Sequence, residues 1–126
     1  MTTKKNIIIA TAESFIGTPY KHGGQNYQGI DCSGMVCKCL QAADVFDFGT
    51  DKTAHELWIM FRHHTCSTAN PGCLVFWFNG DRATHVGVCI SPNLCISATT
   101  KDPQCQCVQY HPLDYRFEKR RYVDIY

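Results

Sequence analysis

Apolar side chains recur every three or four residues in three segments of the first half of the chain, a spacing that predicts helices packed by one face. The first segment covers residues 3–16 and is followed by Gly17, a suitable C-terminal cap. The second runs over residues 32–43. A third helix is predicted after Thr53, because Thr53 and Glu56 have the spacing of a capping box.

The second half of the chain changes to patterns typical of strands, with turn residues between them. Five strands are predicted, at residues 73–78, 84–90, 94–98, 104–110 and 120–125. Helices followed by strands indicate an α+β fold, with N-terminal helices packed on a curled antiparallel sheet of about five strands. We predict a single domain over residues 1–126, because a chain of this length builds one core.

Composition and charge exclude several classes of protein. Hydrophobic residues make up 44% of the chain and charged residues 18%, which supports a buried core and argues against disorder. The formal net charge of +1 gives no long-range attraction to nucleic acid or anionic lipid, so neither is an expected partner. No apolar run approaches the ~20 residues of a membrane span.

The N-terminal segment lacks the features of a signal peptide. Lys4 and Lys5 precede the apolar run at residues 7–9, but Thr11 and Glu13 interrupt it within a few residues. We therefore expect synthesis in the cytoplasm without a signal peptide, and any export to use another route.

The chain has nine cysteines, a high and odd number for its length. Without a signal peptide, most are predicted to be reduced and buried as small apolar side chains. The pairs Cys37/Cys39 and Cys105/Cys107 have C-x-C spacing, and no histidine follows either pair at the spacing of a zinc finger. We therefore predict no metal and no other cofactor.

The tetrapeptide at residues 31–34 is the most informative local motif. A glycine-bearing loop at residues 20–31 delivers Cys32 to the start of the second predicted helix. Unpaired N–H groups and the helix dipole favour thiolate over thiol there, so a nucleophile of lowered pKa is predicted. The alternative interpretation is that Cys32 is only a helix-start residue, capped by Asp31.

His85 is the candidate base. It lies in an alternating strand whose opposite face is apolar, so its own face is left for polar groups. An imidazole there can accept the thiol proton and later protonate a leaving amine. Two other histidines, His63 and His64, lie near a predicted helix end, where stabilisation of the helix dipole explains them. The remaining three lie in loops or at a helix start and are expected on the surface: His22, His55 and His111.

A third group usually orients the imidazole in such sites. If residues 91–93 form a three-residue hairpin loop, Ser97 and Thr99 lie on the same face as His85 in the neighbouring strand. Ser97 is therefore the candidate orienting group, although a hydroxyl is a weaker acceptor than a carboxylate, an amide or an imidazole.

Four separated segments together resemble the NlpC-type cell-wall cysteine peptidases: residues Gly17–Gly24, Asp31–Gly34, Pro71–Phe76 and His85–Val88. Their order, spacing and flanking residues agree over nearly the whole chain. The resemblance implies a papain-like fold and hydrolysis of bacterial peptidoglycan stem peptides, typically between γ-D-glutamate and a diamino acid. Peptidoglycan or a muropeptide is thus the expected partner, and the oligomeric state is not predicted.

The resemblance also implies roles for individual residues. By position, Cys32 is the nucleophile and His85 the base, and the backbone N–H of Cys32, with the Tyr20 hydroxyl, would stabilise the oxyanion. Tyr20, Asp31 and Ser33 match positions that line the substrate side. In family members that require a free L-alanine amine, an acidic group at the Asp31 position can pair with it.

Two positions depart from the family pattern. Ser97 stands where the family usually has His, Asn or Gln, and Cys73 replaces an acidic residue often found after the Pro-Gly pair. His111 and Gln109 on a neighbouring strand are further candidates for the orienting group, ranked below Ser97.

Other functions stay open from the sequence. A papain-like acyltransferase, or a lipid or amide hydrolase, would use the same dyad, and a catalytically weak domain would only bind wall peptides or form part of an assembly. Metal-dependent hydrolysis fits less well. Without a signal peptide or a wall-binding repeat, the chain fits a phage-borne enzyme, an injected effector or a cytoplasmic enzyme that recycles muropeptides.

Overall fold

The computed structural model describes residues 3–102 and 104–125. Within these residues the chain forms three α-helices and two antiparallel sheets. The helical elements are α1 (Thr3–Ser14), α2 (Cys32–Ala42), α3 (Ala54–Phe61) and the 3₁₀ turns η1 (Arg62–His64) and η2 (Leu113–Tyr115). The small sheet pairs β1 (Gln25–Asn26) with β2 (Gly29–Ile30). The large sheet contains β3 (Thr65–Cys66), β4 (Leu74–Asn79), β5 (Arg82–Ser91), β6 (Leu94–Ala98), β7 (Val108–Pro112) and β8 (Lys119–Val123).

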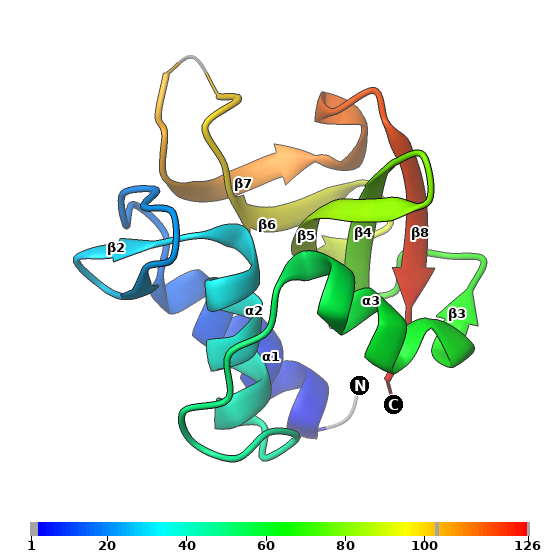
Figure 1. Cartoon of the computed structure of the whole chain (residues 1–126), viewed down its shortest axis with the longest axis horizontal. Coiled ribbons are helices and arrows are strands. Elements are labelled where there is room, and N and C mark those ends of the chain that lie inside the picture. Colours follow the sequence, from blue (N-terminus) through cyan, green and yellow to red (C-terminus); the bar gives the residue numbers. More distant parts are fainter. Residues whose placement is uncertain (1–2, 103, 126) are drawn as a thin grey trace.

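The strands of the large sheet follow the order β3-β8-β4-β5-β6-β7, and the predicted α+β fold is confirmed. In Figure 1 the sheet curls around the upper right of the molecule, with α1 and α2 at the lower left. The sheet has six strands instead of about five, because β3 is only two residues long and carries no periodic pattern. The hairpin β1-β2 lies inside the predicted loop at residues 20–31.

The fourth predicted strand, at residues 104–110, begins later than expected. β7 starts at Val108, because the two residues before it pair elsewhere: Tyr20 N–H donates to the Gln106 carbonyl, and Cys107 bridges Pro19. The segment before β7 is thereby held against the glycine-bearing loop. The position of Pro103 lies outside the described residues.

The three predicted helices are confirmed with small changes at their ends. α1 ends at Ser14, two residues earlier than predicted, and Gly17 follows with a φ of 88°, a left-handed conformation that glycine adopts without strain. The capping box of α3 is present in both directions. The Thr53 hydroxyl accepts a 3.1 Å bond from the Glu56 N–H, and the Glu56 carboxylate accepts a 2.9 Å bond from the Thr53 N–H.

The large sheet is buried on both faces. One face packs on the helices through alternate residues such as Phe76, Val86 and Ile96. The opposite face forms a smaller cluster that contains Trp77 and several cysteines.

Among the described residues, seven cysteines are unpaired thiols and most of them are buried, as predicted for reduced, small apolar side chains. Cys105 and Cys107 form a disulfide. No helix in the described ranges has the length and apolar character needed to cross a membrane.

Candidate active site

Cys32 is the first residue of α2, and Asp31 is the N-cap of that helix. The Asp31 carboxylate accepts a 2.7 Å bond from the Gly34 N–H through Oδ1 and a 2.8 Å bond from the Gly23 N–H through Oδ2. One oxygen therefore caps the helix and the other holds the glycine-bearing loop. The capping interpretation of Asp31 is confirmed, and its predicted contact with substrate stays a prediction.

Gly34 allows the first turn of α2 to lie directly against the glycine-bearing loop. A Cβ added at Gly34 would stand 2.4 Å from the Gly24 carbonyl oxygen and 2.8 Å from Asp31 Oδ1, closer than real Cβ atoms approach other atoms. The opposed backbone atom cannot move aside as a flexible side chain would. The spacing of glycines around Asp31 thus fixes where Cys32 enters the site.

Removing the cap tests its part in the fold. We expect Asp31→Ala to lower the free energy of unfolding by about 1–2 kcal/mol, because the Gly34 N–H loses its acceptor. Asp31→Asn, which keeps an acceptor oxygen, should cost less. Urea unfolding of both variants measures the difference, and an alanine variant as stable as the native protein would contradict the capping role.

The Cys32 thiol lies in a nearly dry environment, with 8% of the residue exposed. Burial raises its pKa to about 11, and hydrogen bonds from the backbone N–H groups of Val86 and Ser33 offset this only in part. The prediction of a lowered thiol pKa is wrong for this site, because desolvation outweighs the helix start. The Val86 contact also places the thiol beside the residue that follows His85.

His85 extends from β5 opposite Trp77 on β4 and is only 4% exposed. Burial lowers its pKa well below 6.5, and the nearby positive charge of Arg116 acts in the same direction. The shifts of both pKa values therefore favour the neutral thiol of Cys32 and the neutral imidazole of His85. Its Nε2 lies 2.9 Å from the hydroxyl oxygen of Tyr115, so Nδ1 is the nitrogen left to face a reacting group.

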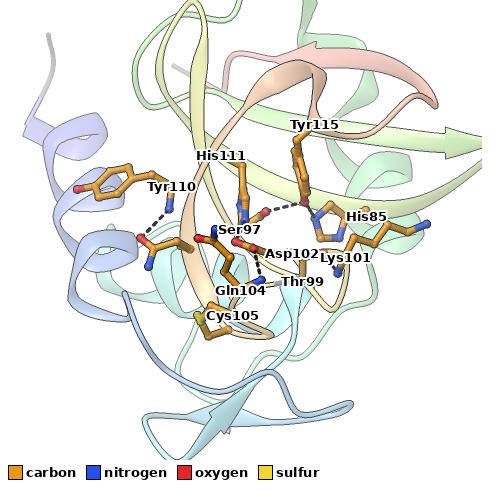
Figure 2. A network of polar contacts seen from close by, with 12 residues as sticks. His85, Ser97, Thr99, Lys101, Asp102, Gln104, Cys105, Tyr110, His111 and Tyr115 are labelled. Atoms are coloured by element: carbon orange, nitrogen blue, oxygen red, sulfur yellow. Dashed lines mark hydrogen bonds and ion pairs between the residues drawn. A yellow bond between two sulfur atoms is a disulfide. The ribbon is translucent and has the colours of Figure 1, made fainter.

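Ser97 is fully buried on β6 and shares a face with His85, as predicted, although the β5-β6 loop contains two residues instead of three. Its Oγ lies 3.0 Å from the Tyr115 hydroxyl, so Ser97 meets the imidazole through the tyrosine. Figure 2 shows the Tyr115 side chain pointing between the two residues. Tyr115 has no periodic or motif signal, because it lies in the 3₁₀ turn η2 between strands.

Tyr20 and Ser33 lie close to the thiol. Burial raises the pKa of the partly buried Tyr20 phenol, and the neighbouring Cys32 and Asp31 groups raise it further. The Ser33 hydroxyl donates a long 3.3 Å bond to Asp31 Oδ1. The structure thus brings Tyr20, Asp31 and Ser33 close to the thiol at the start of α2, while the contribution of each to substrate binding stays a prediction.

The two lower-ranked orienting candidates have other partners. The Gln109 side chain accepts a 3.1 Å bond from the Tyr110 N–H. His111 is only 5% exposed, so its predicted surface position is wrong: its ring stacks on Tyr115 with centroids 4.3 Å apart, and its Nε2 lies 3.3 Å from Asp102 Oδ2. In the described part of the chain, the side chain within hydrogen-bond distance of His85 Nε2 is Tyr115.

Within residues 3–102 and 104–125, no group of three or more His, Cys, Asp or Glu side chains is arranged to hold a metal ion. The groups described above are a thiol, an imidazole and hydroxyls. This set suits nucleophilic catalysis on an acyl group.

Comparison with known proteins identifies the family. The sequence pattern of the NlpC/P60 family matches residues 17–125, which include every segment of the candidate site. This chain belongs to the NlpC/P60 family.

Two curated relatives of this NlpC/P60 chain come from Escherichia coli strain K12. The protein named "Probable endopeptidase NlpC" is 32% identical over 90 residues, or 70% of this chain and 57% of the relative. The protein named "Murein DD-endopeptidase MepS/Murein LD-carboxypeptidase" is 31% identical over 96 residues, or 76% of this chain and 50% of the relative. The chain thus spans about half the length of the curated relatives it matches.

A solved structure agrees in fold. The NlpC/p60 domain of the peptidoglycan hydrolase SagA superposes with a TM-score of 0.72 at 24% identity and covers 96% of this chain and 98% of that one. This likeness confirms the NlpC/P60 architecture of helices packed on an antiparallel sheet.

Proposed function

We propose that this NlpC/P60 domain is a cysteine endopeptidase that hydrolyses peptidoglycan stem peptides through a thioester on Cys32, with His85 as general base. The scissile bond is the amide between γ-D-glutamate and the diamino acid. One relative is named an endopeptidase and the other a murein endopeptidase, and these names support the reaction type and the substrate class.

The observation that carries the proposal is the position of the Cys32 thiol. It lies at the start of α2 against the backbone of Val86, the residue next to His85, in a site with little exposure. The imidazole presents Nδ1 to the reacting side because Tyr115 engages Nε2. The Val86 backbone bond ties the thiol to the strand that carries His85, and a nucleophile with a neighbouring base is the minimum set for acyl transfer.

The first chemical step transfers a proton and forms one bond. The thiol proton moves to Nδ1 of His85 as Sγ of Cys32 attacks the carbonyl carbon of the γ-D-glutamyl amide. Because an isolated thiolate is costly in this buried site, the two charges form together as a thiolate–imidazolium pair. The carbonyl oxygen becomes an oxyanion, for which the Cys32 N–H and the Tyr20 hydroxyl are the proposed donors.

The second step breaks the amide and regenerates the enzyme. The imidazolium of His85 protonates the leaving amine of the diamino acid, which leaves γ-D-glutamyl thioester on Cys32. Water then gives a proton to the neutral imidazole, attacks the thioester, and releases the carboxylic acid and the thiol. Asp31 retains unused lone pairs beside its two backbone bonds, so it can also pair with a free L-alanine amine of the substrate.

The pH dependence follows from a neutral ground-state pair. The pKa of His85 is held well below 6.5, and the Cys32 thiol has a pKa of about 11. We expect kcat/KM on a muropeptide to be flat from pH 6.5 to about pH 10. The value of kcat/KM falls only below this range, because a protonated His85 imidazole cannot accept the thiol proton. An acid limb centred above pH 6.5 would contradict a depressed imidazole pKa.

The reaction itself is tested with defined muropeptides. The reduced protein is incubated with stem peptides that carry or lack a free L-alanine amine, and the products are identified by mass spectrometry. Products cleaved after γ-D-glutamate support the proposal, and dependence on the free amine supports the role of Asp31. Intact muropeptides together with an acylated Cys32 from a lipid or other acyl donor would overturn it in favour of a different acyl substrate.

A further inference from the structure

The Tyr115 hydroxyl lies between the catalytic imidazole and a buried serine. Its oxygen is 2.9 Å from Nε2 of His85 and 3.0 Å from Oγ of Ser97. Tyr115 is 30 residues from His85 and 18 from Ser97, and it enters the site from η2, after the last strand of the β5-β6-β7 hairpins. Figure 2 shows the Tyr115 side chain with its hydroxyl directed toward His85.

Aromatic contacts hold the Tyr115 ring in place. It stacks on His111 with an angle of 14° between the planes, and it meets Trp77 edge to face at a centroid distance of 5.7 Å. His111 is itself anchored, since its Nε2 lies 3.3 Å from Asp102 Oδ2. A ring packed on two sides keeps its hydroxyl at a defined point, as a positioning group requires.

The direction of the two hydrogen bonds decides whether the site can react. A phenol donates one hydrogen bond and its oxygen can accept others. If Nε2–H of His85 donates to Tyr115 and Tyr115 donates to Ser97, Nδ1 carries a lone pair and can take the proton of Cys32. If Ser97 donates to Tyr115 and Tyr115 donates to Nε2, Nδ1 carries the hydrogen and the thiol has no acceptor.

We propose that Tyr115, with Ser97 as the acceptor of its proton, is the positioning residue that holds His85 in the tautomer with a bare Nδ1. This inference rests on the function proposed above. The same Nε2–H bond persists when the imidazole becomes charged, so the tyrosine oxygen also stabilises the imidazolium that forms during attack. Tyr115 thereby does from η2 what a polar residue at the Ser97 position would do directly.

Removing one oxygen atom tests the proposal. Tyr115→Phe keeps the ring and its stacking but leaves Nε2–H buried without an acceptor, so we expect kcat to fall about 10- to 100-fold with little change in KM. Ser97→Ala should cause a smaller loss, because the Thr99 hydroxyl also bonds Tyr115 and can accept its proton. The double variant should be no slower than Tyr115→Phe alone, since both changes interrupt one chain of bonds.

Tyr110→Phe is the matched control. It removes another tyrosine hydroxyl, one that donates a 2.8 Å bond to Glu13 on the surface, and should leave kcat unchanged. If Tyr115 serves only packing, Tyr115→Phe will also be as active as the native protein, because the ring is retained. That result, or strictly multiplicative losses in the double variant, overturns the proposal.

The tautomer can be measured without a substrate. The full chain is labelled with ¹⁵N, and the ring nitrogen resonances of His85 are assigned with a His85→Gln variant. These resonances should show a protonated Nε2 and a bare Nδ1. Tyr115→Phe should shift the population toward the tautomer with a protonated Nδ1. A protonated Nδ1 in the native protein overturns the inference even if muropeptides are cleaved. Conversely, a protein that cleaves no muropeptide but shows the expected tautomer refutes only the proposed function.

Discussion

Cys32→Ala is expected to reduce muropeptide hydrolysis by at least about 10⁴-fold, because no thioester can form without the thiol. Residual turnover would come only from binding and from donors to the oxyanion. The fold should survive, because the N-cap of α2 is provided by Asp31 and the substitution only shortens the side chain. Initial rates of product release, measured by mass spectrometry for both proteins, give the ratio.

Cys39→Ala is the matched control for the loss of a cysteine. Cys39 lies about two turns further along the same helix and is fully buried in the core. Its loss should lower stability and leave kcat close to native. Full hydrolysis by Cys32→Ala would refute the thioester mechanism, and equal losses in the two variants would point to a defect in the fold of α2.

His85→Ala has the second largest expected effect, a loss of about 10³-fold or more in kcat/KM at neutral pH. The Cys32 thiol has a pKa of about 11, so at neutral pH very little of it ionises without a base. Alkylation of Cys32, followed by peptide mass spectrometry, should therefore become slower in the variant and recover as the pH rises toward 11.

His63→Ala is the control for the loss of an imidazole. His63 lies in η1, exposed and outside the site, so its substitution should change neither hydrolysis nor alkylation of Cys32. Alkylation of Cys32 that is equally fast in His85→Ala and in the native protein at neutral pH would show that His85 does not activate the thiol.

Local patterns in the sequence determined the helices and the placement of the thiol. The capping box at Thr53 and Glu56 and the apolar spacing of α2 depend on residues within one or two turns of each other, so they can be recognised without knowing the fold. Cys32 was placed at a helix start for the same reason. Alternation along β5 put His85 on a face opposite Val86, because side chains of a strand point to opposite sides in turn.

Pairing between strands was predictable only where a short hairpin connects them. Ser97 and His85 share a face because a register shift between Cys89 and Ser91 offsets the two-residue turn and restores the pairing that a three-residue loop would give. The two-residue strand β3 and the late start of β7 depend on partners that are distant in sequence. A periodic pattern reports which side of a segment is buried and does not report which segment lies beside it.

Tertiary structure alone decided the environment of the reacting groups. Tyr115 meets His85 only because the chain after β7 returns across the sheet face, and no local pattern encodes that path. Tertiary packing also raises the pKa of the Cys32 thiol, although its place at a helix start predicted a lowered one. The helix start that favours a thiolate is visible in the sequence, but the desolvation that overrides it arises from the sheet and loop that close over the thiol.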